Sequence, residues 1–127
     1  MLDYASTFFI VRDIRTSVAY YTDVLGFRCL FLVPEEAPFL AAVSRNGVSF
    51  TLKEIGPETP PLPNMERHED ARWDVYVHTP DPDALYAELE PRGARVHVPL
   101  GDHPHDGLRS FELRDADGYV LAFGRPL

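Results

Sequence analysis

The feature that most constrains this chain is an internal repeat of about half its length. Three kinds of signal recur at nearly constant spacing: an aspartate that opens a helix, a glycine that follows it, and a hairpin turn. Asp13 and Asp81 lie 68 residues apart, Gly26 and Gly93 lie 67 apart, and the turns at 46–47 and 117–118 lie 71 apart. A repeat of this kind is one supersecondary module used twice. The chain of 127 residues is therefore expected to fold as two similar modules.

The apolar pattern within each module predicts a strand, a helix and three further strands. In the first half, apolar runs predict strands over 7–11, 27–33, 39–43 and 48–53, with a helix from 13 to 26. In the second half they predict strands over 73–78, 95–98, 109–114 and 119–123, with a helix from 81 to 93. The segment between 98 and 109, rich in His, Pro, Asp and Gly, is expected to be a loop.

A segment without hydrophobic periodicity separates the two halves. Residues 56–71 hold four of the 12 prolines, which indicates a connector. We expect one α+β domain over 1–127, with tandem β-α-β-β-β modules at about 4–55 and 72–127. The modules would form curved mixed sheets with the helices outside, leaving a concave face as a cup for a ligand.

Composition excludes several functional classes. Twelve Lys+Arg against 20 Asp+Glu give a net charge of -8, which disfavours nucleic acid as a partner and suits a cationic ligand. The single cysteine, Cys29, cannot form an internal disulfide. No signal-like start or apolar run of roughly 20 residues is present, so we expect a cytoplasmic protein without a membrane partner.

Two stretches resemble the vicinal oxygen chelate superfamily, which includes glyoxalases, extradiol dioxygenases and bleomycin-resistance proteins. They are VRDIRTSVAYYTDVLGF at 11–27 and LRDADGYVLAF at 113–123. The resemblance extends over nearly the whole chain and implies the tandem-module fold. Activity in such a fold depends on what lines the cup, so it must be argued from the site.

The resemblance also implies where a metal would be bound. Enzymes of the superfamily hold a divalent ion with His, Gln or Glu side chains at equivalent positions of both modules. At those positions this chain has Ser6, Thr51, Asp74 and Ala122. Hydroxyls are weak ligands, alanine has no donor, and one carboxylate does not hold zinc, nickel or iron firmly. We therefore expect no metal, no cofactor and no catalytic residue.

Strand alternation predicts which side chains line the cup. Positions of the same parity as the four equivalent sites include Phe8, Ser49, Thr51, Asp74 and Tyr76. Aromatic rings with one carboxylate suit a flat, amphipathic ligand, planar or cationic, through stacking and charge pairing. The alternative is that the rings fill a collapsed cup while Asp74 bonds a neighbouring arginine.

Among metal-free members, the bleomycin-resistance proteins resemble this chain most, over 39–50, 83–88 and 107–115. Those proteins are dimers that sequester a drug in grooves between subunits. The resemblance implies a groove-lining role for Phe31, Phe39 and the loop containing His105, and Arg109 lies in the last matching stretch. That loop has His105 and Asp106 where those proteins tend to have a tryptophan, so the ligand itself is not predicted. We expect a homodimer that binds an antibiotic-like small molecule by sequestration.

Two enzymatic interpretations stay open. A register slip of one residue would exchange the two faces of a strand, so that other side chains would face the cup. The main alternative is therefore a metal-dependent lyase or dioxygenase whose ligands are other residues than the four named above. A metal-free isomerase could use Asp74 with Tyr76 or His78 for proton transfer, although no spacing selects it.

Overall fold

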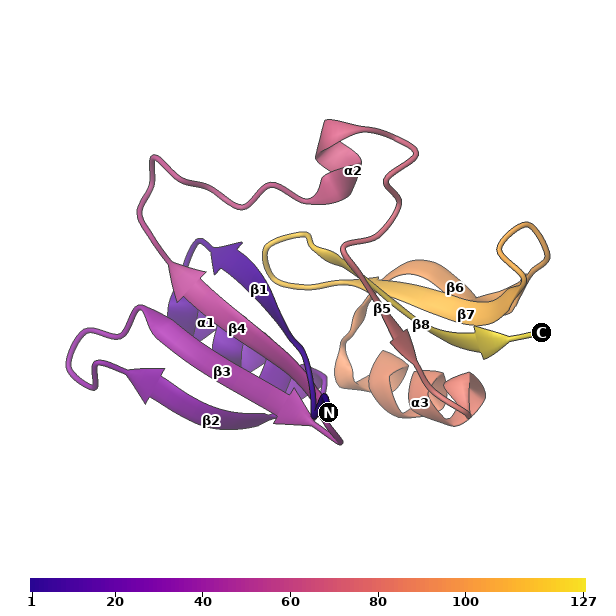
Figure 1. The fold of residues 1–127 in the computed structure, drawn as a ribbon, viewed down its shortest axis with the longest axis horizontal. Helices are drawn as coiled ribbons and strands as arrows, with labels where there is room; N and C mark the ends of the chain where they lie inside the picture. The colour runs from indigo at the N-terminus through magenta and orange to yellow at the C-terminus, as the bar shows by residue number, and fades with distance from the viewer. The chain divides into compact units, whose positions relative to one another are not determined.

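In the computed structural model, which describes residues 1–127, the chain divides into two units, Met1–Leu62 and Pro63–Leu127. Each unit holds one four-stranded sheet with a helix on one of its faces (Figure 1). The boundary falls within the predicted connector, so each unit carries one of the two modules. None of the helices is long and apolar enough to span a bilayer.

Unit 1 contains one helix and four strands. Its elements are β1 (Ser6–Val11), α1 (Ile14–Ala19), the π-helical turn η1 (Tyr20–Val24), β2 (Arg28–Val33), β3 (Leu40–Arg45) and β4 (Val48–Glu54). The strand order is β1-β4-β3-β2, with β1 parallel to β4 and the other pairs antiparallel. α1 begins where the Asp13 side chain accepts a hydrogen bond from the Thr16 amide at 3.0 Å, an interaction that lowers the pKa of Asp13.

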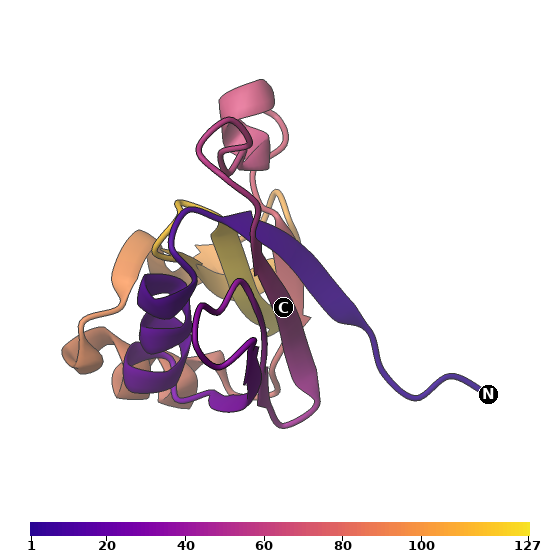
Figure 2. The same cartoon turned by 90° about the vertical axis from the view of Figure 1, so that its left-hand side faces the viewer.

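The core of unit 1 lies between the sheet and the helical segment, which runs alongside the strands in Figure 2. Phe50 of β4 is fully buried at its centre. Its ring lies 5.6 Å from that of Phe9, 5.1 Å from that of Tyr21 and 5.7 Å from that of Phe27. Aromatic packing of this kind joins β1, β4 and η1 into one layered unit.

Unit 2 repeats this topology with one addition. Its elements are α2 (Asn64–Arg67), β5 (Val75–His78), α3 (Pro82–Leu89), the 3-10 turn η2 (Glu90–Arg92), β6 (Arg95–His103), β7 (Leu108–Arg114) and β8 (Val120–Pro126). The order β5-β8-β7-β6 matches that of unit 1. Phe111 stacks on Phe123 at 5.3 Å and meets Tyr86 of α3 at 5.1 Å, which marks the helix-covered face of this sheet.

The α+β class and the repeated module are confirmed, and two segments differ from expectation. The segment expected as a loop after 98 begins as strand, because β6 continues to His103 through irregular pairing between Val96 and Gly101. Such an irregularity accommodates Pro99, which has no amide to donate. The predicted connector also contains α2, at whose start the Asn64 amide donates to Asp74 at 2.9 Å.

Candidate functional site

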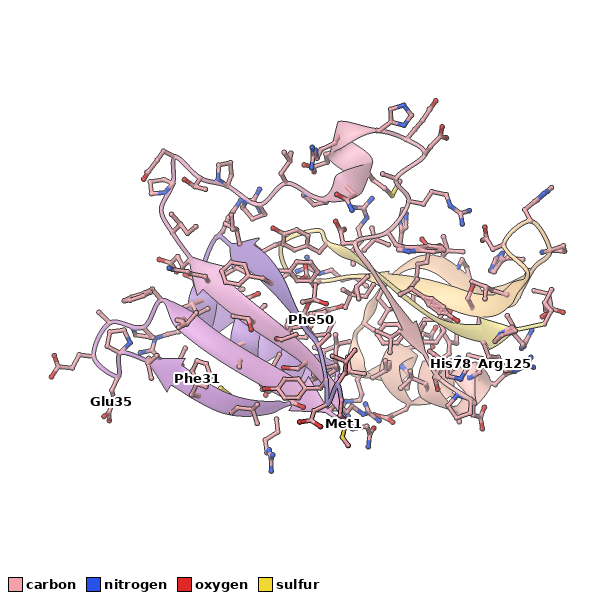
Figure 3. The ribbon with its side chains drawn as sticks, in the orientation of Figure 1. Met1, Phe31, Glu35, Phe50, His78 and Arg125 are labelled. Atoms are coloured by element: carbon pink, nitrogen blue, oxygen red, sulfur yellow. The ribbon has the colours of Figure 1, made fainter.

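The first face is the side of the unit 1 sheet opposite α1. Phe9 and Phe50 point into the core, so Phe8 and Thr51, their neighbours along β1 and β4, point away from it. Pairing across the strands aligns Phe8 with Thr51, Thr51 with Ala42, and Ala42 with Phe31. Figure 3 shows Phe31 on β2 and Phe50 on β4.

The four aligned residues Phe8, Thr51, Ala42 and Phe31 form a row across the sheet, in which an exposed ring stands at each end and small side chains lie between. Phe8 is 56% exposed and Phe31 is 42% exposed, while Thr51 and Ala42 between them are small. Three strand spacings separate the outer positions, a span of about 14 Å. A flat apolar molecule of two or three fused rings matches that span and can contact both phenylalanines.

Hydroxyl groups border the row on one side. The Ser6 hydroxyl lies 2.8 Å from that of Thr51 and 3.3 Å from that of Ser49, so the three form a hydrogen-bonded chain. On the other side the Lys53 ammonium lies 6.0 Å from the centre of the Phe39 ring, which is 45% exposed. Unit 1 therefore brings together all of its predicted ligand contacts, namely Phe8, Phe31, Phe39, Ser49 and Thr51.

The four positions that correspond to the superfamily's metal ligands do not form a donor set for a divalent ion. Ser6 and Thr51 bond to each other, and Ala122 offers no donor atom. The two oxygens of Asp74 accept separate backbone amides, from Asn64 at 2.9 Å and from Val120 at 2.8 Å. Within either unit, no three His, Cys, Asp or Glu side chains are placed to hold a metal ion. These side chains do not fit the ion that related enzymes use.

The second face is the side of the unit 2 sheet opposite α3. Pairing across β5, β8, β7 and β6 aligns Tyr76, Ala122, Glu112 and Val98 in one row. The Tyr76 ring meets that of Trp73 edge-on at 6.1 Å. The predicted contact Tyr76 therefore lies on this face, and His78 follows two residues along the same strand (Figure 3).

Glu112 is the residue of this face that the sequence reasoning missed. It is only 7% exposed, and burial, the largest effect, raises the pKa of its carboxyl. The charges of Arg72 and His103 oppose that rise, while Asp106 adds to it. Two signals were available: an acidic residue within the apolar run 111–113, and a hairpin register that places it opposite Ala122.

An ion pair lies beside Glu112. The Arg72 guanidinium donates to Asp106 at 2.6 Å and lies 5.2 Å from the centre of the Trp73 ring. An open hollow of about 350 Å³ is lined by Asp70, Ala71, Arg72 and Trp73. The segment that leads into β5 therefore supplies both charge and aromatic surface to unit 2.

Two predicted contacts lie away from both faces. Arg109 donates to Asp83 of α3 twice, each at 2.7 Å, and to Asp102 at 3.0 Å. These carboxylates, Asp83 foremost, raise the pKa of Arg109, whose role here is to tie α3 to the sheet. His105 is exposed in the turn between β6 and β7.

Known structures share this architecture. TioX from Micromonospora sp. ML1 superposes with a TM-score of 0.71 and 23% identity over 97% of this chain and 99% of that one. TnmS3, an antibiotic binding protein from Streptomyces sp. CB03234, superposes with a TM-score of 0.70 and 24% identity. The match covers 100% of this chain and 99% of that one. UcmS2 superposes with a TM-score of 0.72 and 18% identity over 98% of each chain. A search of curated protein sequences gave no match.

The family-level comparison covers most of the sequence. The family model described as Glyoxalase/Bleomycin resistance protein/Dioxygenase superfamily matches residues 3–123. This match includes both modules and both faces described above, and the chain belongs to that superfamily.

Proposed function

We propose that this protein binds an antibiotic-like small molecule and protects by sequestering it, without a metal and without changing it chemically. The observation that carries the proposal is the first face, where exposed Phe8 and Phe31 flank a position that holds a hydroxyl instead of a metal ligand. Exposed rings arranged around a short polar chain suit binding, whereas chemistry of the superfamily's enzymes needs a metal donor set.

The proposed ligand has a planar part that lies over Thr51 and Ala42. Phe8 and Phe31 would contact its edges or faces, and Phe39 would extend the aromatic surface on the side of the row where Lys53 lies. The hydroxyls of Ser49 and Thr51 would exchange hydrogen bonds with its polar groups. On the second face, Tyr76 would offer an aromatic contact of its own, while Asp74 and Arg109 act through the bonds that hold unit 2 together.

A second copy of the chain would complete the site. Unit 1 carries a cluster of large apolar side chains that are each between 42% and 56% exposed, namely Phe8, Phe31, Val33 and Phe39. Apolar clusters of this kind mark interaction surfaces, and two-fold pairing is the commonest way to cover them. TnmS3, whose fold this chain shares, is an antibiotic binding protein, and this likeness supports the ligand class.

The test is a titration of planar and glycopeptide antibiotics into the protein by calorimetry, followed by mass spectrometry of the recovered drug. We expect binding with the drug recovered intact, and affinity about tenfold weaker in Phe8→Ala and in Phe31→Ala. Leu62→Ala is the matched control, because Leu62 is equally exposed but precedes unit 2 outside the sheet. A chemically altered drug, or binding that chelators abolish, would favour the lyase or dioxygenase alternative instead.

A further inference from the structure

We propose that the second face recognises a protonated amine of the ligand through the carboxylate of Glu112. This inference rests on the proposed small-molecule binding and specifies one chemical group of a ligand that binds at the second face. It assigns a role to a side chain on β7, next to Ala122 on the neighbouring strand, which is one of the two positions where the superfamily's enzymes have a metal ligand in this unit.

Glu112 differs from the other buried acids of the chain in having no hydrogen-bond partner. Asp115 accepts the amides of Asp117 and Tyr119 at 2.9 and 3.0 Å, and Asp117 also has a partner. Glu112 is 7% exposed, yet its carboxylate accepts no hydrogen bond from the chain. Among the buried acids, Glu112 is therefore the one whose oxygens are not held by the chain and stay free for a donor from water or from a ligand.

The acceptor atoms of Glu112 remain accessible from solvent. No side-chain oxygen that is fully hidden from solvent lacks a hydrogen bond in this protein. The two oxygens of Glu112 are therefore not fully hidden from solvent, although the residue as a whole is only 7% exposed. A donor arriving from outside can reach them directly.

The charges around Glu112 favour a cation. Arg72, the cation beside it, is already bonded to Asp106 and lies over the Trp73 ring. His103 contacts the Ser110 carbonyl at 3.2 Å. Arg72 is the one permanent cation against the carboxylates of Glu112 and Asp106, which leaves a surplus negative charge when the His103 ring is neutral, in a protein whose net charge is -8. An ammonium group neutralises that surplus and supplies up to three donors.

The row across the sheet limits the size of the ligand near this point. Tyr76 and Glu112 stand on either side of Ala122, two strand spacings or about 10 Å apart between Cα atoms. An amine one carbon away from an aromatic ring can reach both the carboxylate and the tyrosine. Benzylammonium is the smallest probe with this arrangement, and benzyl alcohol is its neutral counterpart of similar shape.

The experiment compares these two probes by backbone amide NMR at pH 7. We expect benzylammonium to shift the amides of Glu112 and its strand neighbours, and to bind about tenfold more tightly than benzyl alcohol. Glu112→Gln keeps the shape, removes the charge and should abolish this preference. Glu90→Gln is the matched control, since it removes the charge of an exposed glutamate beyond α3 and should leave the preference unchanged.

A second variant tests the mechanism independently. Asp106→Asn weakens the hold on Arg72, whose guanidinium then competes with the ligand for Glu112. We expect benzylammonium to bind about threefold or more weakly in this variant. Binding that is unchanged or stronger in Asp106→Asn would overturn the proposed arrangement.

The outcomes separate this inference from the proposed function. If both probes bind equally well to the wild type and to Glu112→Gln, small-molecule binding stands and the amine site is wrong. If neither probe binds but the antibiotic titration succeeds, the amine site is again wrong. Failure of the antibiotic titration together with selective binding of benzylammonium would overturn the proposed function while keeping the amine site.

Discussion

Two carboxylates of unit 2 lie in contrasting surroundings. Asp74 has both oxygens bonded to backbone amides, one at the start of α2 and one at the start of β8. Glu112 is more buried but has no such bond. Strand alternation in the sequence could predict which face Asp74 occupies but not its partners, because these depend on the path by which the connector returns to the sheet.

The first prediction concerns Asp74. In Asp74→Ala the amides of Asn64 and Val120 lose a charged acceptor, so the free energy of unfolding should fall by about 2–3 kcal/mol. Urea denaturation measures this, with Asp3→Ala in the exposed N-terminal segment as the control. An unchanged midpoint with weakened ligand binding would instead support the direct ligand contact predicted from the sequence.

The second prediction concerns the pH dependence that Glu112 imposes. Burial raises its pKa in the folded protein above the ordinary value of 4.5. The charge of Asp106 also raises this pKa, whereas those of Arg72 and His103 lower it. The folded state therefore holds the proton more tightly than the unfolded chain, and stability is lost as the pH rises from about 4.5 through the raised pKa.

Glu112→Gln should accordingly be more stable than the wild type at pH 7, by about 1 kcal/mol. The difference should disappear below pH 4, where the carboxyl is protonated in both states. Urea midpoints measured across this range test the prediction, and Glu90→Gln should show no comparable trend. A wild type that is the more stable of the two at pH 7 would contradict it.

At the scale of elements, apolar periodicity and turn signals predicted seven of the eight strands closely, and these were the ones bounded by clear breaks. The eighth, β6, was cut short because Pro99 and Gly101 resemble loop residues, although the strand continues through its irregular pairing. α2 has only four residues and no hydrophobic period, and its first amide, that of Asn64, donates to Asp74, ten positions further along the chain. Neither feature is visible from local pattern alone.

The third prediction uses adjacent residues of β1 that face opposite sides. Phe9→Ala removes a ring stacked in the core of unit 1 and should lower the free energy of unfolding by about 3–5 kcal/mol. Phe8→Ala removes an exposed ring and should change it by less than about 0.5 kcal/mol. Chemical denaturation of the two variants compares them directly. Similar losses in both would show that the first face is packed rather than open to a ligand.

At the scale of the whole molecule, the repeated module was readable from spacing, and the superfamily from two short motifs. The ligand was not, because neither the aromatic row nor the buried glutamate specifies more than a chemical class. The association state is likewise a property of surfaces, and alternation within a strand does not reveal which exposed face another chain covers.

The fourth prediction is that the protein is a dimer in solution. Light scattering should give twice the chain mass of 14.4 kDa. Val33→Glu places a charge among the exposed apolar side chains of the edge strand β2 and should shift the mass towards the monomer. Glu90→Gln should leave the dimer intact. A wild type that stays monomeric at micromolar concentration would argue against a site completed by a second copy.

The hydroxyl chain of unit 1 can be polarised in either of two directions. In each of its contacts, Ser6 with Ser49 and Ser6 with Thr51, either oxygen can be the donor. Rotation of the O–H bonds therefore reverses the polarity of the whole chain without moving a heavy atom. The same surface can present a proton to a carbonyl of one molecule and a lone pair to an amide of another. The ligand proposed for this face would therefore not be limited to one kind of polar group next to Thr51.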